Sequence, residues 1–521
     1  MAVLDRRCKG ETPTLNMNSK TAKVYLIGAG PGDPGLLTLK GKAILERADC
    51  IVHDFLANEE LLQIARPDAE KIFVGKRGGE HTISQEEINQ LLVSKAREGR
   101  MVARLKGGDP YIFGRGGEEA LGLVKAGIPF EVVPGITSGY AAPAYAGIPV
   151  THRDFTSTVC FITGHEDPTK DESSIDWAKL AAGQGTLVLF MGVKRLPEIT
   201  RVLIAHGRDP RTPVAVIRWG TRPDQEVVTG TLADIAARAA EIQPPAVTVI
   251  GEVVKLREQL NWFENLPLFG RRFVITRTRE QASVLREGLA ALGAEVIEIP
   301  TIEIRDPSSW EPLDSAIRRL EEFHFLLVTS ANGVRNFLAR LKACGRDVRA
   351  LKGLEIGAIG PATAAEFAKT GVKVDFVPRE YRAEGLLDAL GARDLHGKVF
   401  LVPRAKVARD VVPKVLAERG ARVEVVEAYK TAIPVFPEGE IERLLTPLPD
   451  AITFTSSSTA SNFAKLVGES KVADTLRGVA VASIGPVTSD TVRKLGLEVT
   501  IEASESTVPG LLRAIEKYFR G

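Results

Sequence analysis

The chain has 521 residues, 44% of them hydrophobic and 26% charged, with a formal net charge of +2. This length exceeds what one hydrophobic core accommodates and predicts several folding units. The balanced charge argues against a nucleic-acid partner, and no apolar run approaches the roughly 18 residues that a membrane span needs. The four cysteines are dispersed, form no metal-binding pattern and fit a reducing cytoplasm.

The sequence of the first half predicts an α/β fold. Residues 1–20 lack an apolar core segment and are expected to form a disordered tail. Short β-rich runs then alternate with helical stretches up to about residue 254. The expected strands are 24–27, 101–105, 159–163, 186–191, 213–217 and 246–250. The Gly-, Ala- and Pro-rich stretch 135–149 predicts a junction between subdomains of about 21–136 and 150–264, with a ligand cleft there.

A glycine-rich turn, residues 28–35, follows the first expected strand. Its Gly30-x-Gly32-x-x-Gly35 spacing matches a dinucleotide fingerprint, so a nicotinamide dehydrogenase is one interpretation. Two prolines inside the turn remove N–H groups that a phosphate would need, which weakens that interpretation, and a purely structural turn is another. Similar loops, 107–110 and 134–138, follow later strands. Three such loops better suit a sulfonium nucleoside held by backbone and hydroxyl groups.

Cationic residues gather between these loops. They are Lys76, Arg77, Arg104, Lys106, Arg115, His152 and Arg153. In a chain of nearly balanced charge, they suggest a substrate with several carboxylates, with a solvated basic surface as the alternative. His81, His152 and His165 lack the companions of a metal site, so no metal is expected.

Several motifs of the first half occur in a specific order. They are Gly28-Ala-Gly-Pro-Gly-Asp33, Val52-His-Asp54, Val74-Gly-Lys-Arg77, Leu105-Lys-Gly-Gly-Asp-Pro110, Pro134-Gly-Ile-Thr-Ser138 and Thr151-His-Arg153. Over about residues 21–264 the chain resembles uroporphyrinogen-III C-methyltransferase. The resemblance implies methyl transfer from S-adenosyl-L-methionine to uroporphyrinogen III, giving precorrin-2 and S-adenosyl-L-homocysteine. It also implies a homodimer formed through this half.

The resemblance further implies roles for individual residues. Cofactor contacts are expected at Pro31, Gly107, Gly108, Asp109, Ile112, Thr137, Ser138, Met191, Gly220 and Ala246. Substrate carboxylates are expected at Arg77, Lys106, Arg115 and Arg153. Asp54 and Lys76 occupy the family's proton-acceptor and proton-donor positions. Alternatively, Asp54 positions a pyrrole N–H and Lys76 pairs with a substrate carboxylate.

A linker is expected at 265–270, and residues 271–521 contain an internal repeat. Arg277 and Gly293 recur 127 residues later as Arg404 and Gly420, Thr329 recurs after 126 as Thr455, and Gly360 after 125 as Gly485. The repeat predicts two similar Rossmann- or flavodoxin-like α/β lobes facing a shared cleft, with crossovers near 303 and 432. A duplicated scaffold without catalysis is the alternative.

Thr- and Ser-rich strand ends are the main polar feature of this half. The candidates for binding substrate carboxylates are Thr329, Ser330, Ser456, Ser457 and Thr488, with Arg277, Arg279, Arg404, Lys406 and Arg409 as nearby cations. Each serine could equally be an ordinary N-cap.

The order of motifs in this half resembles uroporphyrinogen-III synthase. The motifs are Val274-Ile-Thr-Arg277, Val328-Thr-Ser-Ala-Asn-Gly333, Ile359-Gly-Pro361, Glu427-Ala-Tyr-Lys-Thr431, Phe454-Thr-Ser-Ser457 and Ile484-Gly-Pro486. The resemblance implies cyclisation of hydroxymethylbilane to uroporphyrinogen III, with inversion of the last ring and loss of water. Tyr429 lies at the family's recurrent tyrosine, where it would assist departure of the hydroxyl or pack at a lobe crossover.

Together the two resemblances predict a cytoplasmic fusion of consecutive tetrapyrrole enzymes. It would direct flux towards sirohaem or corrinoids, without a nucleic-acid or membrane partner. The alternative is a methyltransferase fused to a non-catalytic module that senses a tetrapyrrole.

Overall fold

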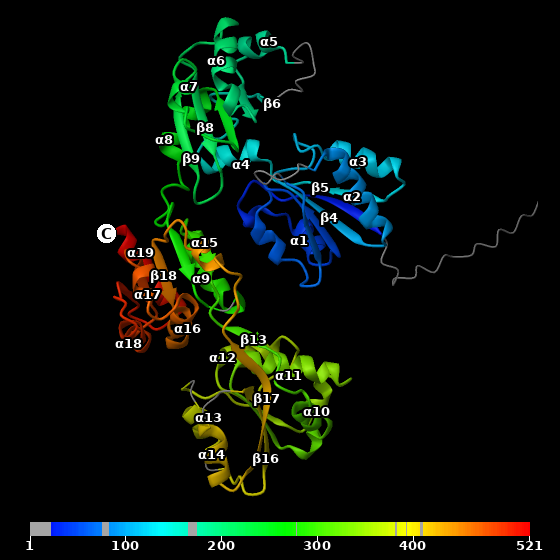
Figure 1. The fold of residues 1–521 in the computed structure, drawn as a ribbon, viewed down its shortest axis with the longest axis vertical. Helices are drawn as coiled ribbons and strands as arrows, with labels where there is room; N and C mark the ends of the chain where they lie inside the picture. The colour runs from blue at the N-terminus through cyan, green and yellow to red at the C-terminus, as the bar shows by residue number, and fades with distance from the viewer. Residues whose placement is uncertain are drawn as a thin grey trace, which may run out of the picture. The chain divides into compact units, whose positions relative to one another are not determined.

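The computed structural model describes residues 22–75, 83–164, 175–277, 279–380, 383–391, 393–406 and 410–521. The chain forms two compact units (Figure 1). One runs to Arg271 and includes Ala290–Glu295, and the other comprises Arg272–Leu289 and Val296–Gly521. No helix in the described ranges is both long and apolar enough to cross a bilayer.

The first sheet is parallel, with strand order β3-β2-β4-β1-β5. Its strands are β1 (Lys23–Gly28), β2 (Cys50–His53), β3 (Glu70–Phe73), β4 (Met101–Lys106) and β5 (Phe130–Val133), and its helices are α1 (Leu39–Leu45), α2 (Gln85–Arg97) and α3 (Gly116–Lys125). Alternating strand residues bury both faces, with Ile27 and Ile51 on one and Leu26 and Val52 on the other. Parallel pairing places the loops that follow these strands at one edge of the sheet.

The second sheet is mixed, with order β6-β7-β10-β8-β9. Its strands are β6 (Val159–Thr163), β7 (Thr186–Phe190), β8 (Pro213–Arg218), β9 (Glu226–Thr231) and β10 (Ala246–Ile250), and the helices are α4 (Ser138–Tyr145), α5 (Trp177–Ala182), α6 (Leu196–Ala205), α7 (Ile235–Arg238) and α8 (Arg257–Leu260). Strand β6 pairs with β7 in parallel, whereas the pairs β7–β10, β10–β8 and β8–β9 are antiparallel. Helix α6 packs Leu196, Ile199 and Leu203 into one core, and α4 places Ala142 in a second core.

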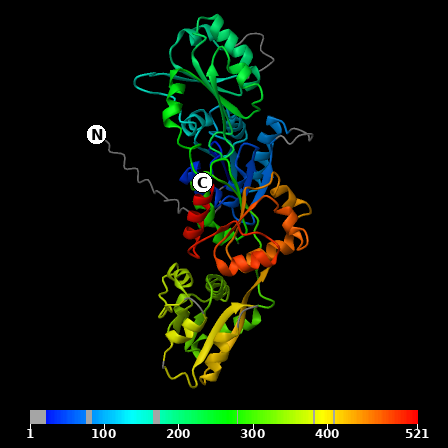
Figure 2. The ribbon, with the colours of Figure 1, turned by 90° about the vertical axis from the view of Figure 1, so that its left-hand side faces the viewer.

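The second unit contains two sheets, ordered β12-β11-β18-β19-β20 and β13-β17-β16-β14-β15. The strands are β11 (Arg272–Ile275), β12 (Glu295–Glu298), β13 (Glu303–Arg305), β14 (Phe325–Val328), β15 (Glu355–Ala358), β16 (Val399–Ala405), β17 (Arg422–Ala432), β18 (Ala451–Phe454), β19 (Ala480–Ser483) and β20 (Ile501–Glu502). The helices are α9 (Arg279–Ala291), α10 (Glu311–Arg318), α11 (Ala331–Ala343), α12 (Pro361–Ala368), α13 (Ala383–Ala389), α14 (Val411–Glu418), α15 (Glu440–Leu444), α16 (Ser457–Val467), α17 (Val472–Thr475), α18 (Pro486–Lys494) and α19 (Val508–Arg520). The longest strand, β17, is drawn in gold (Figure 2).

The internal duplication is confirmed, and the two repeats exchange parts. Strands β11, β12, β14 and β15 of the first repeat correspond in order to β16, β17, β18 and β19 of the second. Each sheet therefore combines the start of one repeat with the end of the other. The local backbone geometry also repeats. Ser330, the N-cap residue of α11, has φ −161° and ψ 152°, and Ser456, the N-cap residue of α16, has φ −166° and ψ 159°. Each lobe thus depends on both halves of the duplicated sequence.

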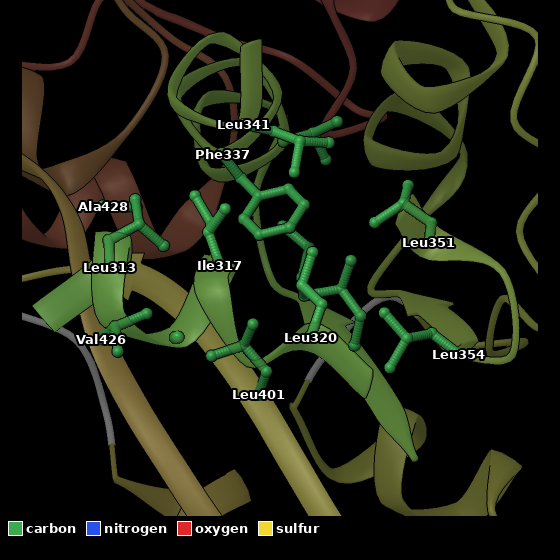
Figure 3. Packing of buried hydrophobic residues seen from close by; sticks show 14 of the residues in the cluster. Leu313, Ile317, Leu320, Phe337, Leu341, Leu351, Leu354, Leu401, Val426 and Ala428 are labelled. Atoms are coloured by element: carbon green, nitrogen blue, oxygen red, sulfur yellow. The ribbon is translucent and has the colours of Figure 1, made fainter. Parts of the chain in front are cut away.

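The lobe that contains β17 has a continuous apolar core (Figure 3). Phe337 and Leu341 of α11 pack with Leu313 and Ile317 of α10, and Val426 of β17 joins the same cluster. All of these side chains are buried. This packing supports the strand end that carries Tyr429.

Candidate functional site

The loops after β1, β4 and β5 meet backbone to backbone. Gly108 N donates to Gly30 O at 2.7 Å, and Gly30 N donates to Gly108 O at 3.2 Å. A Cβ added to Gly28 would lie 2.4 Å from Gly135 Cα and 2.6 Å from Gly108 O. No side chain fits at these distances, so the glycines are required by the close approach of the three loops.

Asp109 joins the second and third loops. Its Oδ1 accepts hydrogen bonds from Tyr111 N at 2.8 Å and Ile112 N at 3.2 Å, and its Oδ2 accepts one from Gly135 N at 2.9 Å. The resemblance implied that Asp109 contacts the cofactor. Most of its acceptor capacity is used within the protein, which gives the carboxylate a structural role. Its contact with a cofactor stays a prediction.

The first loop is held by the segment between the sheets and by the end of β8. Asp33 N donates to Thr221 Oγ1 at 3.0 Å, and the Tyr145 hydroxyl donates to Asp33 Oδ2 at 2.7 Å. Burial and the Asp33 carboxylate raise the pKa of Tyr145 well above its usual value, so the phenol stays protonated. These bonds connect the two sheets of this unit beside the glycine loops.

Residues in the left-handed backbone region cluster at the same strand ends. They are Phe113, Arg115, Met191, Trp219 and Thr221, with φ between 48° and 75°. A non-glycine residue held in this conformation destabilises the fold by about 1 to 3 kcal/mol. Such conformations cluster at ligand sites. Met191 was predicted from the resemblance, and its side chain is 53% exposed. The other four conformations had no signal in the sequence.

Most of the other expected cofactor residues lie at these same ends of the two sheets. Thr137 caps α4 by accepting a hydrogen bond from Gly139 N at 3.4 Å, and Ser138 N lies 3.7 Å from the position of a Cβ on Gly108. Gly220 packs against α4, where a Cβ would lie 2.3 Å from Ala142 Cβ. Ala246 begins β10 and pairs with Arg218 at the end of β8. Pro31 and Gly107 are half-buried in the first and second loops, and Ile112 is exposed.

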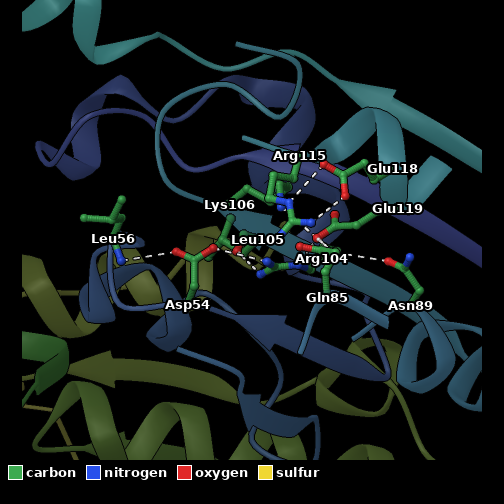
Figure 4. Close-up of polar contacts among 10 residues, drawn as sticks. All are labelled: Asp54, Leu56, Gln85, Asn89, Arg104, Leu105, Lys106, Arg115, Glu118 and Glu119. Atoms are coloured by element: carbon green, nitrogen blue, oxygen red, sulfur yellow. Dashed lines mark hydrogen bonds and ion pairs between the residues drawn. The ribbon is translucent and has the colours of Figure 1, made fainter. Parts of the chain in front are cut away.

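Asp54 follows β2 and lies at the edge of a buried charge cluster (Figure 4). Its Oδ1 accepts from Leu56 N at 3.1 Å, and its Oδ2 is 3.2 Å from Arg104 Nη2. Arg104 Nε and Lys106 Nζ both reach Glu119 Oε1, at 3.1 and 2.7 Å. Burial and the neighbouring Arg104 lower the pKa of Lys106.

Two of the expected substrate cations are therefore oriented differently from the expectation. Arg104 and Lys106 are both 4% exposed and pair inside the protein instead of facing solvent. Arg115 is exposed and forms a two-point ion pair with Glu118, and Arg153 is also exposed. Lys76, Arg77 and His81 lie outside the described residues. The substrate-binding roles of Arg77, Arg115 and Arg153 stay predictions, whereas Lys106 Nζ is bound by Glu119 inside the protein.

In the second unit, Tyr429 is 6% exposed and belongs to the core of its lobe. Its hydroxyl lies 2.9 Å from Ser330 Oγ, which also accepts a hydrogen bond from Gly333 N. A shift in the β16–β17 register falls between Arg404 and Ala405, and such irregularities re-aim side chains. Burial raises the pKa of Tyr429. These contacts provide the packing role that the sequence allowed, and a catalytic role stays a prediction.

The other Ser and Thr candidates lie at strand ends or in the first turn of the helix that follows, and several of them form hydrogen bonds within the protein. Ser330 and Ser456 cap α11 and α16, which matches the N-cap alternative. Ser457 Oγ donates to Val487 O at 3.1 Å, Thr488 is buried and Thr329 is half-buried. Of the cations, Arg404 pairs with Asp410, and Lys406 Nζ donates to Ser308 Oγ at 3.1 Å. Arg409 and the Arg279 side chain lie outside the described part.

Two family models match the chain: tetrapyrrole (corrin/porphyrin) methylases over residues 23–236 and uroporphyrinogen-III synthase HemD over residues 283–513. The porphyrin biosynthesis protein HemD of Ruminiclostridium josui is 36% identical over 492 residues, covering 94% of this chain and 96% of that protein. The chain belongs to the fused uroporphyrinogen-III C-methyltransferase and uroporphyrinogen-III synthase family.

Two further relatives match shorter stretches of the chain. The S-adenosyl-L-methionine-dependent uroporphyrinogen III methyltransferase of Methanosarcina barkeri is 58% identical over 246 residues, covering 47% of the chain and 96% of that protein. The uroporphyrinogen-III C-methyltransferase of Bacillus subtilis is 44% identical over 360 residues, covering 69% of the chain and 74% of that protein. A methylase family at residues 23–236 replaces the nicotinamide interpretation of the first glycine turn.

Proposed function

We propose that the chain catalyses two consecutive steps of tetrapyrrole biosynthesis. The second unit cyclises hydroxymethylbilane to uroporphyrinogen III, and the first unit methylates that product to precorrin-2. The observation that carries the methylation is the meeting of three glycine loops in the part of the chain matched by the methylase family. The same part carries the exposed Met191 directly after β7. The loops offer backbone groups and hydroxyls but little to grip a phosphate, as a sulfonium nucleoside requires.

S-Adenosyl-L-methionine supplies an electrophilic sulfonium methyl, and the S–CH₃ electron pair remains on sulfur in S-adenosyl-L-homocysteine. For each methyl that bonds to a pyrrole carbon, the ring must lose one proton. Asp54 is the proton acceptor in this proposal, because it is the partly exposed member of an otherwise buried cluster, with a 26% exposed side chain. Lys76 is the proposed proton donor. The glycine loops and Thr137 would orient the cofactor.

In the second unit, binding and shielding of a reactive linear tetrapyrrole would account for most of the rate. The proposed contacts with its carboxylates are hydroxyls at strand ends and helix starts, those of Thr329, Ser330, Ser456, Ser457 and Thr488. Tyr429 is proposed to assist departure of the hydroxyl group, acting through or together with Ser330 at 2.9 Å. The family match over residues 283–513 favours a synthase over a non-catalytic sensor.

Each activity has its own test. Uroporphyrinogen III and S-adenosyl-L-methionine carrying a labelled methyl should give labelled tetrapyrrole, whereas no transfer by protein that binds S-adenosyl-L-homocysteine would contradict the methyltransferase assignment. Hydroxymethylbilane alone should give the inverted type III isomer. An isomer ratio equal to that of spontaneous closure would instead favour the sensor.

The remaining assignments are part of the same proposal. The functional division is 21–264, a linker at 265–270 and 271–521, with a homodimer formed through the first part. The described cysteines Cys50, Cys160 and Cys344 are free thiols, which agrees with a cytoplasmic location. Light scattering of the full chain would test the dimer by its mass.

A further inference from the structure

The charge cluster behind Asp54 contains a carboxylate that the proposed methyl transfer leaves unassigned. Glu119 lies on α3, and its side chain has no exposed surface. Its Oε1 accepts from Lys106 Nζ at 2.7 Å, Arg104 Nε at 3.1 Å and Gln85 Nε2 at 3.3 Å. Among the described residues, Glu119 Oε2 has no hydrogen-bond partner. One oxygen of a fully buried carboxylate thus accepts hydrogen bonds from three side chains, two of them cationic (Figure 4).

The geometry of Arg104 connects this buried carboxylate with Asp54. Arg104 and Lys106 are two residues apart on β4, so their side chains lie on the same face of the sheet. Arg104 Nε donates to Glu119 Oε1 at 3.1 Å, and Arg104 Nη2 lies 3.2 Å from Asp54 Oδ2 in an ion pair. Because the guanidinium is planar, the bond from its Nε to Glu119 constrains the position of the Nη2 nitrogen beside Asp54. Asp54 Oδ1 is held separately by Leu56 N.

The charges of this cluster balance as two cations and two carboxylates. Glu119 forms ion pairs with Lys106 Nζ and Arg104 Nε. Asp54 is paired with the same guanidinium through Nη2 alone. Without the charge of Glu119, two buried cations would face one carboxylate, and buried charges without partners are costly. Asp54 would then be drawn towards them and away from solvent.

We propose that Glu119 is a positioning residue for Asp54. It neutralises Lys106 and orients Arg104, so that the Asp54 carboxylate keeps its exposed side available to accept a proton from the tetrapyrrole. This inference rests on the proposed role of Asp54 as the base of the methyl transfer.

Three variants of the full chain test the inference: Glu119→Gln, the double variant Glu119→Gln/Lys106→Met, and Asp54→Asn. Glu119→Gln keeps the shape and an acceptor oxygen but removes the charge. We expect its kcat for methyl transfer to fall about 10- to 100-fold, as misplacement of a reacting group does, with the KM for S-adenosyl-L-methionine unchanged. The double variant restores the charge balance around Arg104 and should recover most of the lost kcat.

The outcomes separate this inference from the proposed function. Circular dichroism and S-adenosyl-L-homocysteine affinity report whether each variant is folded, and the double variant covers the case in which Glu119→Gln alone fails to fold. A folded Glu119→Gln with kcat within twofold of the parent, or a folded double variant no faster than the single one, overturns the positioning role. If Asp54→Asn retains full turnover, the base assignment fails, and the inference fails with it. Loss of turnover in Asp54→Asn with normal turnover in Glu119→Gln removes only the inference.

Discussion

The substitution Gly135→Ala tests whether the close backbone contacts of the glycine loops shape the cofactor site. A Cβ at this position would lie 2.3 Å from Gly108 O, 2.6 Å from Gly28 Cα and 2.8 Å from Gly28 C. Contacts under 3.0 Å are essentially never seen for real Cβ atoms, so the Gly108 carbonyl would have to move by at least the 0.7 Å that separates 2.3 from 3.0 Å. All three obstructing atoms belong to backbone, so no side chain can rotate away.

The shift would separate loops that are joined by short hydrogen bonds. Gly108 N to Gly30 O is 2.7 Å, and Gly135 N to Asp109 Oδ2 is 2.9 Å. Overpacking of this kind costs about 1 to 3 kcal/mol. If this free-energy cost destabilises the loop arrangement that binds the cofactor, the Kd for S-adenosyl-L-homocysteine should rise about 5- to 150-fold.

Isothermal titration calorimetry with S-adenosyl-L-homocysteine measures this change directly. Gly117→Ala is the matched control, because Gly117 is an exposed residue of α3 with nothing within 4 Å of an added Cβ. It should leave affinity unchanged and stabilise the helix by up to about 1 kcal/mol. Affinity of Gly135→Ala within twofold of the parent would refute the argument that these backbone contacts shape the cofactor site.

Three further predictions concern the proposed base, the phenol and a buried ion pair. Asp54→Asn should abolish methyl transfer while S-adenosyl-L-homocysteine still binds, and unchanged turnover would remove the base role. Tyr429→Phe breaks the bond to Ser330 and should cost about 1 kcal/mol of unfolding free energy, with slower type III isomer formation; a normal rate and isomer purity would assign Tyr429 to packing alone. Asp314, 11% exposed, is held by Arg340, and this bonding keeps its pKa below the usual 3.8. Asp314→Asn should therefore cost about 2 kcal/mol at pH 7, and the difference should shrink as the pH falls below about 3.8 and through the folded-state pKa. Urea unfolding at pH 7 and pH 3 measures it, and an equal difference at both would contradict the ion-pair explanation.

Much of the fold could be predicted from local sequence. The expected strands 159–163 and 246–250 coincide with β6 and β10, and four others end within one or two residues of the observed strands. Apolar β-branched runs that stop at Gly or Pro define such strands clearly. The repeat was also visible because Ser and Gly caps must recur where the same helix start recurs.

Crossovers between the lobes were expected near 303 and 432, but the order of strands in each sheet was not predictable, because similarity between two segments does not say which strands pair. The charged residues show the same limit. Arg104 and Lys106 looked like surface cations for a polyacid, but Glu119, 13 residues beyond Lys106 in the sequence, accepts from both inside the protein. Burial of a charge depends on such a partner, which only the folded chain brings close. The positive φ values of Phe113 and Trp219 likewise come from tertiary contacts and leave no local signal.

We propose that a single chain forms uroporphyrinogen III and then methylates it. The most direct measurement is to incubate the full chain with hydroxymethylbilane and S-adenosyl-L-methionine and to identify the tetrapyrrole by absorbance and mass. We expect precorrin-2 derived from the type III isomer, with two methyl groups from the donor. Unmethylated tetrapyrrole, or a methylated product only from the uninverted isomer, would contradict it.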